Sequence, residues 1–264
     1  MDRSYLFAPG HNAKLLTKVF DAGADAVILD LEDAVPPDAK QRAREMVAEA
    51  LPEHPAWVRI NGARNTAAAA DLAVVCESAF GIRIPKVESV ADVRWVAERA
   101  PGKPLLCAIE SARGVVNALA IASEPRVTYL ALGGIDLQRD LGVASGDAPL
   151  DYVRSHLVVA CRAAGIAPPI DSVYPRLDDD AGLRAQAESG RRLGLFGKSA
   201  VHPAQLAIIH AAFEPDEAEL RWAQEVVEAF EAAGGDAVRL QSGEFVDLPV
   251  AERARAVLAR GATV

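Results

Sequence analysis

Short apolar runs alternate with amphipathic segments along most of the chain. The apolar runs predict strands near 4–7, 26–30, 56–60, 82–85, 104–109, 127–132, 168–171 and 194–197. Between them, apolar residues three or four positions apart predict helices at 12–22, 38–50, 65–78, 89–99, 113–122, 149–164, 179–193 and 203–212. Regular alternation of this kind predicts parallel strands joined by right-handed crossovers.

The alternation favours an α/β fold of the TIM-barrel type, (β/α)8, over an open doubly wound sheet. Eight strands can close into a barrel, and closure removes exposed strand edges. In an open sheet, ligand-binding residues gather at the one point where the strand order reverses. Here polar residues follow strands all along the chain, which is the pattern expected around a barrel mouth.

The pattern changes after residue 215. Residues 216–233 predict one amphipathic helix, Gly-Gly-Asp at 234–236 ends it, and a last helix is expected over about 250–260. We therefore expect a TIM-barrel catalytic domain at 1–215 and a short helical C-terminal extension at 216–264. The extension is small for an independent core, so we expect it to pack as a lid on the barrel or on a neighbouring subunit.

The composition mainly excludes certain kinds of partner and cellular location. The chain of 264 residues fits one barrel of about 250 residues, and its net charge of −9 argues against nucleic acid or a membrane surface as partners. No stretch approaches the ~20 apolar residues of a membrane span, and no signal-peptide pattern is visible. The three cysteines, Cys76, Cys107 and Cys161, are isolated. We interpret them as small buried hydrophobic residues in a reducing, cytoplasmic compartment.

Acidic residues follow two adjacent predicted strands. Glu110 comes after the fifth strand and Asp136 after the sixth. Because the carboxyl ends of barrel strands converge on one mouth, these carboxylates should be neighbours there. Two carboxylates without a nearby His or Cys pair suit Mg2+, with Mn2+ as a possible substitute. The alternative is that each carboxylate caps the helix that follows it.

Two further features suit an anionic substrate beside such a metal. Gly133 and Gly134 precede Asp136, and glycines let backbone amides approach a carboxylate closely, although a Gly-Gly pair is also a common plain turn. Arg59 ends the third strand, where a guanidinium can hold a carboxylate or stabilise an enolate. Its alternative role is an ion pair with the acidic run at 30–33.

The acidic run should alternate in direction if it continues the second strand. Asp30 and Glu32 would then face the barrel interior, and Asp33 would face the helix layer or the N-terminus of a helix. This makes Glu32 the better partner for Arg59 or for a metal-bound water.

Lysines also follow predicted strands. Lys86 and Lys198 could each form a Schiff base with a keto acid, or neutralise the carboxylates around them, and the surrounding acids favour neutralisation. His202 lies at the start of the last barrel helix, where a capping or packing role is the simpler interpretation than a general base.

Several longer motifs occur in a characteristic order. They lie at 3–10, 23–35, 59–61, 85–89, 109–114, 134–137, 197–205 and 245–250. The most specific are Asp-Leu-Glu-Asp at 30–33, Val-His-Pro at 201–203 and Phe-Val-Asp-Leu-Pro at 245–249. In this order they resemble the citrate lyase beta-chain-like family, which includes malyl-CoA and citramalyl-CoA lyases. The resemblance spans nearly the whole chain.

The resemblance implies a homotrimeric TIM-barrel enzyme in which Glu110 and Asp136 bind Mg2+. The substrate-binding residues that it implies, with their neighbours, are Arg59, Lys86, Gly133, Gly134 and Ile135. It also implies that Asp247, on the extension, reaches an active site, most simply that of an adjacent subunit. Arg3 and Arg113 are then candidates for contacts with the phosphates of coenzyme A.

The implied reaction is a reversible Claisen-type cleavage of a 3-hydroxyacyl-CoA to acetyl-CoA and a 2-keto acid. Arg59 and Glu32 would act at the reacting end, and Asp247 would exchange the proton on the acetyl carbon. One alternative is a citrate lyase beta subunit that acts on an acyl-carrier-protein thioester within a complex. Others are a keto-acid-binding protein without turnover and a Schiff-base aldolase. The acyl group is not readable from sequence, because malyl and citramalyl differ by one methyl group.

Overall fold

The computed structural model describes residues 1–143 and 148–261. Its chain forms two compact units, Met1–His210 and Ala211–Val264, and each is described by itself. The division falls inside helix α10 (Leu206–Phe213), slightly before the boundary expected from the sequence.

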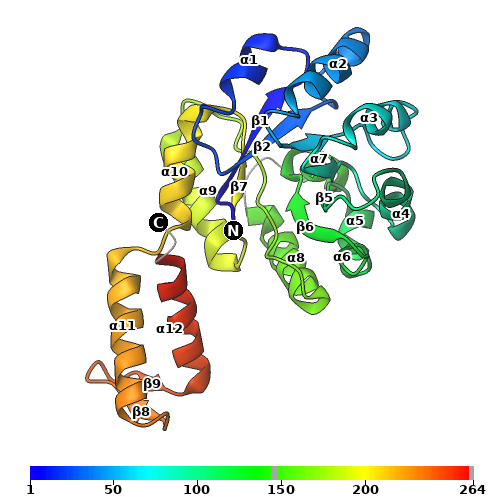
Figure 1. Ribbon diagram of the computed structural model, residues 1–264. Coiled ribbons are helices and arrows are strands. Elements are labelled where there is room, and N and C mark those ends of the chain that lie inside the picture. Colours follow the sequence, from blue (N-terminus) through cyan, green and yellow to red (C-terminus); the bar gives the residue numbers. More distant parts are fainter. Residues whose placement is uncertain (144–147, 262–264) are drawn as a thin grey trace. The chain divides into compact units, whose positions relative to one another are not determined.

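A curved parallel sheet forms the centre of the first unit, with strand order β6-β5-β4-β3-β2-β1-β7 (Figure 1). Its strands are β1 (Ser4–Pro9), β2 (Ala26–Asp30), β3 (Trp57–Arg59), β4 (Gly81–Ile84), β5 (Leu105–Ile109), β6 (Val127–Leu132) and β7 (Lys198–Ala200). Between β6 and β7, Ile170 bridges Ala131 and Asp171 bridges Lys198, both in parallel. This segment takes the eighth strand position, so the predicted α/β TIM barrel is confirmed.

Helices cover the outside of the sheet (Figure 1). They are α1 (Ala13–Lys18), α2 (Lys40–Ala50), α3 (Ala67–Val75), α4 (Val90–Arg99), α5 (Ala112–Val116), α6 (Ala118–Ala122), α7 (Gly134–Leu141), α8 (Asp151–Ala164), α9 (Asp180–Leu193) and α10. Short 3-10 turns lie at Pro37–Ala39, Ala148–Leu150 and Pro203–Gln205. Two details differ from expectation: the helix at 113–122 is divided at Asn117, and α7 was not anticipated.

Local chemistry fixes the loop that carries Lys86. Ser89 begins α4 with a capping box, in which its hydroxyl accepts from the Asp92 amide and the Asp92 carboxylate accepts from the Ser89 amide. Such a box satisfies two of the amides that a helix start leaves unpaired. The loop between β4 and α4 is therefore anchored within a few residues of the strand end.

Alternate strand residues fill the barrel interior. Tyr5, Ile28, Trp57, Leu106, Ala131 and Ile170 form one buried cluster. Gly81 makes room for the indole, because a Cβ there would lie 2.4 Å from the Trp57 ring. Side chains two positions further along each strand point the same way, so the next inward residues form a layer nearer the mouth.

The second unit has a small core of its own. It contains α11 (Glu217–Ala232), a two-stranded antiparallel hairpin of β8 (Val238–Arg239) and β9 (Phe245–Val246), and α12 (Leu248–Gly261). Its buried residues are Ala223, Val226, Phe230, Leu240, Val246, Ala251, Ala254 and Val257. Asp247 precedes α12 and accepts a hydrogen bond from the Val250 amide at 3.3 Å, so it caps the start of that helix. No helix in the described part of the chain is long and apolar enough to cross a membrane.

Candidate active site

The carboxyl ends of the strands enclose a cavity of about 320 Å3, called here the mouth cavity. Its lining residues are Phe7, Pro9, Asp30, Asp33, Ala34, Arg59, Arg83, Glu110, Leu132, Gly133, Ile135, Asp136, Ser172, Val173, Ser199 and Val201. It thus brings together Arg59, Glu110, Asp136 and two of the other predicted substrate residues. Most of these positions directly end a strand or follow it, as expected for a barrel site.

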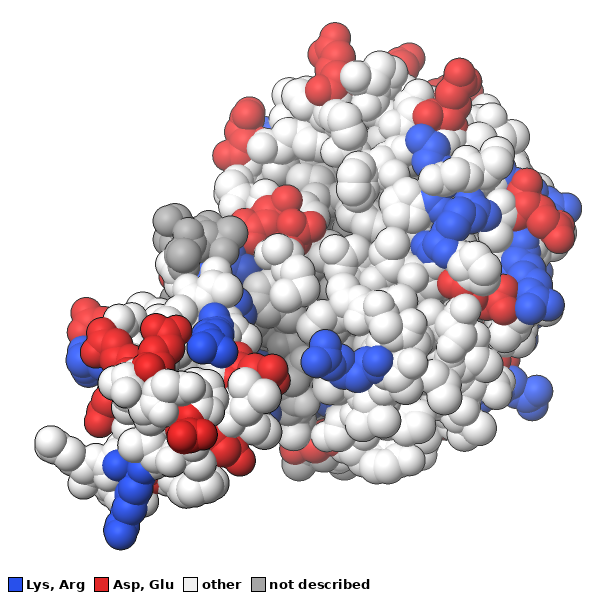
Figure 2. Space-filling model, turned by 60° about the horizontal axis from the view of Figure 1, so that its bottom comes forward, with Lys and Arg blue, Asp and Glu red and all other residues white. Residues whose placement is uncertain are grey.

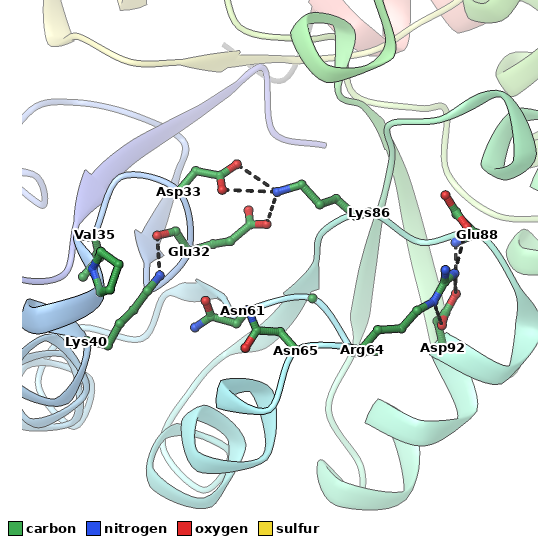
Figure 3. A pocket seen from close by; sticks show the side chains of 13 residues that line it. Glu32, Asp33, Val35, Lys40, Asn61, Arg64, Asn65, Lys86, Glu88 and Asp92 are labelled. Carbon is green, nitrogen blue, oxygen red and sulfur yellow. Dashed lines mark hydrogen bonds and ion pairs between the residues drawn. The ribbon is translucent and has the colours of Figure 1, made fainter. Parts of the chain in front are cut away.

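A second cavity of about 650 Å3 lies on the β2, β3 and β4 side, and Figure 3 shows it from close by. Glu32 and Lys86 line it, and Asp33 lines both cavities. Lys40 lies at one end, where its ammonium donates to the Glu32 and Leu31 carbonyls. Arg64 lies at the other end, paired with Glu88 and Asp92.

Arg59 is held by an acid from the neighbouring strand. Its Nε and Nη2 donate to the two carboxylate oxygens of Asp30 at 2.6 and 2.7 Å. Burial alone would raise the pKa of Asp30, but Arg59 and the amides of Glu32 and Ala34 hold that pKa below its usual range. The ion pair that was the alternative role for Arg59 is therefore present. It fixes the guanidinium plane while leaving Arg59 on the cavity wall.

Glu32 lies between two cations. Its Oε1 accepts from the Lys86 ammonium, and its Oε2 is 3.3 Å from Arg59 Nη1 but has no hydrogen-bond partner. Burial raises the pKa of Glu32 above its usual value despite these cations. The Lys86 ammonium also donates to Asp33 at 3.0 Å (Figure 3). The expectation that Asp33 faces the helix layer is therefore wrong, because the chain turns after Leu31.

Lys86 supports neutralisation rather than nucleophilic chemistry. Burial opposes its charge, but hydrogen bonds to Glu32 and Asp33 outweigh burial and raise the pKa of Lys86. Its amine is therefore protonated at neutral pH and unsuited to attack a carbonyl. The backbone at Lys86 has a φ of 52°, which is uncommon for a residue with a side chain. Strain of this kind is found where a side chain must be held in one place.

Glu110 and Asp136 line the mouth cavity together. Glu110 is 7% exposed, and its Oε2 is buried without a hydrogen-bond partner. Burial, assisted by the charges of Glu32 and Asp136, raises the pKa of Glu110 to about 7. Asp136 lies in the first turn of α7, 2.6 Å from Arg139. A buried acid with an unpaired oxygen beside a second acid is an arrangement that a cation would stabilise.

These two carboxylates suit a partly hydrated Mg2+ ion better than a metal whose ligands all come from protein side chains. Among residues 1–143 and 148–261, no three His, Cys, Asp or Glu side chains cluster as a metal site. A cation here would take the two carboxylates and complete its shell with water or substrate oxygens, which is the usual habit of Mg2+.

The glycines before Asp136 act by their lack of side chains. The Gly133 amide donates to the Ile109 carbonyl at 2.9 Å, and the Gly134 amide donates to Ser172 Oγ at 2.9 Å. Both amides are thus used, which contradicts the expectation that they are free to bind an anion. A Cβ on Gly133 would lie 2.2 Å from Glu110 Cγ, so glycine is needed for Glu110 to pack there.

Lys198 is the first residue of β7 and does not follow a strand, so its predicted place at the mouth is wrong. Its side chain is fully buried, and its ammonium donates to Asp171 at 3.0 Å and to the Ser172 carbonyl at 2.6 Å. Arg154 binds the same Asp171 at 3.1 Å. This buried group, the Asp171 triad, has a structural role.

Three other predicted residues, Arg3, Arg113 and His202, lie away from the mouth cavity lining. Arg3 precedes β1 and pairs with Asp25, which precedes β2, so it lies at the opposite end of the strands. The structure therefore gives no support to a coenzyme A contact for Arg3. Arg113 is exposed in α5, just beyond the end of β5. His202 caps a 3-10 turn, since its Nδ1 accepts from the Ala204 amide.

Two cavity residues were missed from the sequence. Arg83 points inward from β4, is 4% exposed, and has no hydrogen-bond partner for Nε or Nη1. Ser172 follows the two bridging residues of the eighth strand position. The signal for Arg83 was available as a charged residue within the short apolar strand Gly-Ile-Arg-Ile. Arg83 lies inside the strand and not after its end, so the strand-end pattern does not include it.

The thiols offer no competing nucleophile in the barrel core. Burial raises the pKa of Cys107 above its usual range and that of Cys161 to about 12. Cys76 is free but partly exposed, which differs from the buried state expected for all three.

Residues 3–203 match the family model described as HpcH/HpaI aldolase/citrate lyase. The chain belongs to the HpcH/HpaI aldolase/citrate lyase family. The predicted citrate lyase beta-like membership is thereby confirmed, and the protein is an enzyme of the oxo-acid-lyase type.

Within the HpcH/HpaI aldolase/citrate lyase family, relatives of different activity are equally similar. A citrate lyase subunit beta-like protein of Deinococcus radiodurans is 37% identical over 278 residues, covering 98% of this chain and 97% of the relative. A (3S)-malyl-CoA thioesterase of Cereibacter sphaeroides is 37% identical over 272 residues, covering 99% and 95%. The CitE protein of Mycobacterium tuberculosis, crystallised with magnesium, acetoacetate and coenzyme A, superimposes with a TM-score of 0.88 at 31% identity, covering 98% and 97%.

Proposed function

We propose that this enzyme is a Mg2+-dependent carbon–carbon lyase that reversibly cleaves a 3-hydroxyacyl-CoA to acetyl-CoA and a 2-keto acid. The observation that carries the proposal is the pairing of Glu110 and Asp136 in one cavity with Arg59. Glu110 brings a buried oxygen without a partner, and Arg59 is pre-oriented by Asp30. Magnesium in the crystallised M. tuberculosis relative supports the choice of metal.

Glu110 and Asp136 would hold the metal, with Glu32 close enough to influence it. When bound there, Mg2+ supplies a Lewis acid for the substrate's carboxylate and hydroxyl oxygens. Arg59 contributes fixed positive charge at the same wall of the cavity. Because Asp30 already orients its guanidinium, Arg59 stabilises developing negative charge without reorganising.

Proton movements can be assigned to two acids. Glu32 lines the adjoining cavity and its Oε2 has no hydrogen-bond partner, so we assign to it the proton of the substrate hydroxyl, taken through an intervening water. The oxygen then forms a carbonyl, the bond to the thioester's α-carbon breaks, and its electron pair passes to a thioester enolate. Asp247 supplies the proton that converts the enolate to acetyl-CoA. This last role rests on the family motif at 245–250, and we propose that a neighbouring subunit of a homotrimer supplies it.

Two alternatives remain distinct outcomes of one assay. Purified protein would be incubated with malyl-, citramalyl-, citryl- and hydroxymethylglutaryl-CoA, with Mg2+, with Mn2+ and with a chelator, and products identified by mass spectrometry. We expect acetyl-CoA and a keto acid only when a divalent ion is present. Release of free coenzyme A and an intact hydroxy acid would instead indicate a thioesterase, as in the C. sphaeroides relatives. Turnover only with an acyl-carrier-protein thioester would indicate a citrate lyase beta subunit.

A Schiff-base route predicts a different signature. Lys86 is charged and paired, and Lys198 is fully buried. We therefore expect borohydride treatment with pyruvate to leave the intact protein mass unchanged. A stable mass increase located on either lysine would contradict the metal-dependent mechanism.

A further inference from the structure

Two guanidinium groups lie side by side in the mouth cavity. Arg59 on β3 and Arg83 on β4 are register partners in the parallel sheet, and both point into the barrel. Their Cζ atoms lie 4.8 and 5.0 Å from the centroid of the same Phe7 ring. Neighbouring strands are about 4.8 Å apart, so the two side chains face the same small space.

The two arginines differ in what they bind. Arg59 is satisfied by two hydrogen bonds to Asp30 and an ion pair with Glu32. Arg83 is more deeply buried, and neither its Nε nor its Nη1 has a hydrogen-bond partner. Burial, followed by the repulsion from Arg59, lowers the pKa of Arg83 to about 10, which still leaves it charged at neutral pH. A buried charge without hydrogen bonds is unfavourable unless a ligand completes it.

The acids around Arg83 do not complete it. Asp30 is committed to Arg59, and Glu32 to Lys86 and Arg59. Glu110 shares the cavity, yet its Oε2 and the two Arg83 nitrogens each lack a hydrogen-bond partner. These atoms therefore do not bond to one another. Arg83 thus lines, with Nε and Nη1 unpaired, a space that already contains the proposed metal-binding and carboxylate-binding groups.

We infer that Arg83 binds a second carboxylate of the substrate, and so selects for a dicarboxylic 2-keto acid as the cleavage product. This inference rests on the proposed function. The carboxylate next to the keto group would be held at the metal and Arg59, whereas a carboxylate two carbons further along would fill Arg83. A guanidinium fork matches a carboxylate with two parallel hydrogen bonds. A product with one carboxylate, such as pyruvate or glyoxylate, would leave Arg83 unpaired.

Binding without turnover tests the inference directly. Affinities of oxaloacetate, pyruvate and 2-oxobutyrate would be measured calorimetrically with Mg2+ present, using wild type, Arg83→Met and Arg94→Met. We expect wild type to prefer oxaloacetate by at least about 100-fold, since a site built to bind a polar group rejects analogues that lack it. Arg83→Met should remove that preference and change pyruvate affinity by less than about threefold. Arg94→Met is the matched control, because Arg94 pairs with Glu124 on the surface.

The possible outcomes separate this inference from the proposed function. Equal affinity of wild type for the three acids, or an unchanged preference in Arg83→Met, would overturn the role of Arg83 even if lyase activity is found. An Arg83-dependent preference would support it even if no cleavage is detected. If Arg83→Met does not fold, Arg83→Lys keeps the charge but loses the fork, and should retain the fold while losing most of the preference. An Arg83→Lys protein with full preference would contradict carboxylate recognition by the fork.

Discussion

At the scale of single residues, the decisive feature is that Glu110 is buried and no hydrogen-bond donor contacts its Oε2. Most buried carboxylates are paired or fully hydrogen-bonded, because an isolated buried charge is expensive. Here the neighbouring charges of Glu32 and Asp136 make matters worse, and the pKa of Glu110 rises to about 7. Such an acid lowers the stability of the metal-free protein, and a bound cation would relieve that cost.

The Glu110→Gln variant should therefore have opposite effects on metal binding and on stability. The amide keeps the shape but loses the charge, so Mg2+ binding by calorimetry should fall below detection. The metal-free protein should unfold at an equal or higher temperature, because a buried charge has been removed. Exposed Glu77→Gln is the control and should change neither quantity. Unaltered Mg2+ affinity in Glu110→Gln would remove this residue from the metal site.

Gly133 offers a steric test of the same arrangement. In Gly133→Ala the new Cβ would collide with Glu110 Cγ, so the acid must move. We expect a loss of about 1–3 kcal/mol in unfolding free energy together with weakened Mg2+ binding. Gly62→Ala is a matched control, since the nearest atom to its Cβ would be 3.9 Å away. Wild-type Mg2+ affinity in Gly133→Ala would show that Glu110 does not need its observed position.

At the scale of elements, the sequence predicts regular strands well and irregular ones poorly. The bounds of β2 and β6 match expectation, because each is an apolar run ended by a polar or glycine residue. The last strand was expected at Gly-Leu-Phe-Gly, residues 194–197, whereas β7 begins at Lys198. A lysine inside a buried strand is stable only because Asp171 lies behind it, and periodicity along the chain carries no information about that partner.

The site residues that follow strand ends were predicted well, and the others were predicted poorly. Strand-end logic brought Arg59, Glu110 and Asp136 to one cavity from sequence alone. It missed Arg83, which interrupts an apolar strand, and it misjudged the Gly133 and Gly134 amides. The start of α7 at Gly134 was also hidden, because a Gly-Gly pair is a stronger signal for a turn than for a helix start. These cases depend on contacts between segments that are distant in the sequence, and the local residue pattern carries no information about such contacts.

The Asp171 triad predicts a large and pH-dependent contribution to stability. Burial opposes the charge of Asp171, but Lys198 and Arg154 lower its pKa. Asp171→Asn leaves both cations without a buried counter-charge and should cost about 3–5 kcal/mol in urea unfolding at pH 7. The contribution is present above the ordinary Asp pKa of about 3.9 and is lost as pH falls through the lower native value.

Measurements of both proteins at several acid pH values check the sign of this effect. The difference between wild type and Asp171→Asn should therefore shrink below about pH 4. Exposed Asp178→Asn serves as the comparison and should unfold like wild type. A difference that grows on acidification would contradict the assignment of the ion triad as the source of stability.

At the scale of the whole molecule, charge alone does not attract an anionic substrate. The net charge is −9, and acidic and basic side chains are interspersed on the face seen in Figure 2. Under the proposed function, an anionic substrate would be held by local groups such as Arg59 and Arg83, which line the mouth cavity. The expected role of Asp247 adds a second requirement, since it lies in the separate unit Ala211–Val264.

Complementation between two inactive variants tests how Asp247 is supplied. Glu110→Gln and Asp247→Asn would each be inactive alone. If neighbouring subunits exchange Asp247 around a ring, co-expressed mixed oligomers should recover up to about one quarter of wild-type activity, because half the sites have an intact barrel and half of those receive an intact acid. Activity recovered in acetyl-CoA release assays would support supply from a neighbour. No recovery in verified mixed oligomers would place Asp247 in its own subunit's site, whereas wild-type activity of Asp247→Asn alone would place it outside the mechanism.

The eighth strand position has a mechanical consequence. Ile170 and Asp171 join β6 to β7 as isolated bridges rather than as a regular strand, and the backbone of Ile170 makes two hydrogen bonds to β6. A closed sheet opens locally first where few backbone hydrogen bonds connect neighbouring strands. We therefore expect amide hydrogen exchange to be faster at residues 170–171 than in the other barrel strands. Such a difference would show that solvent first reaches the core at this position.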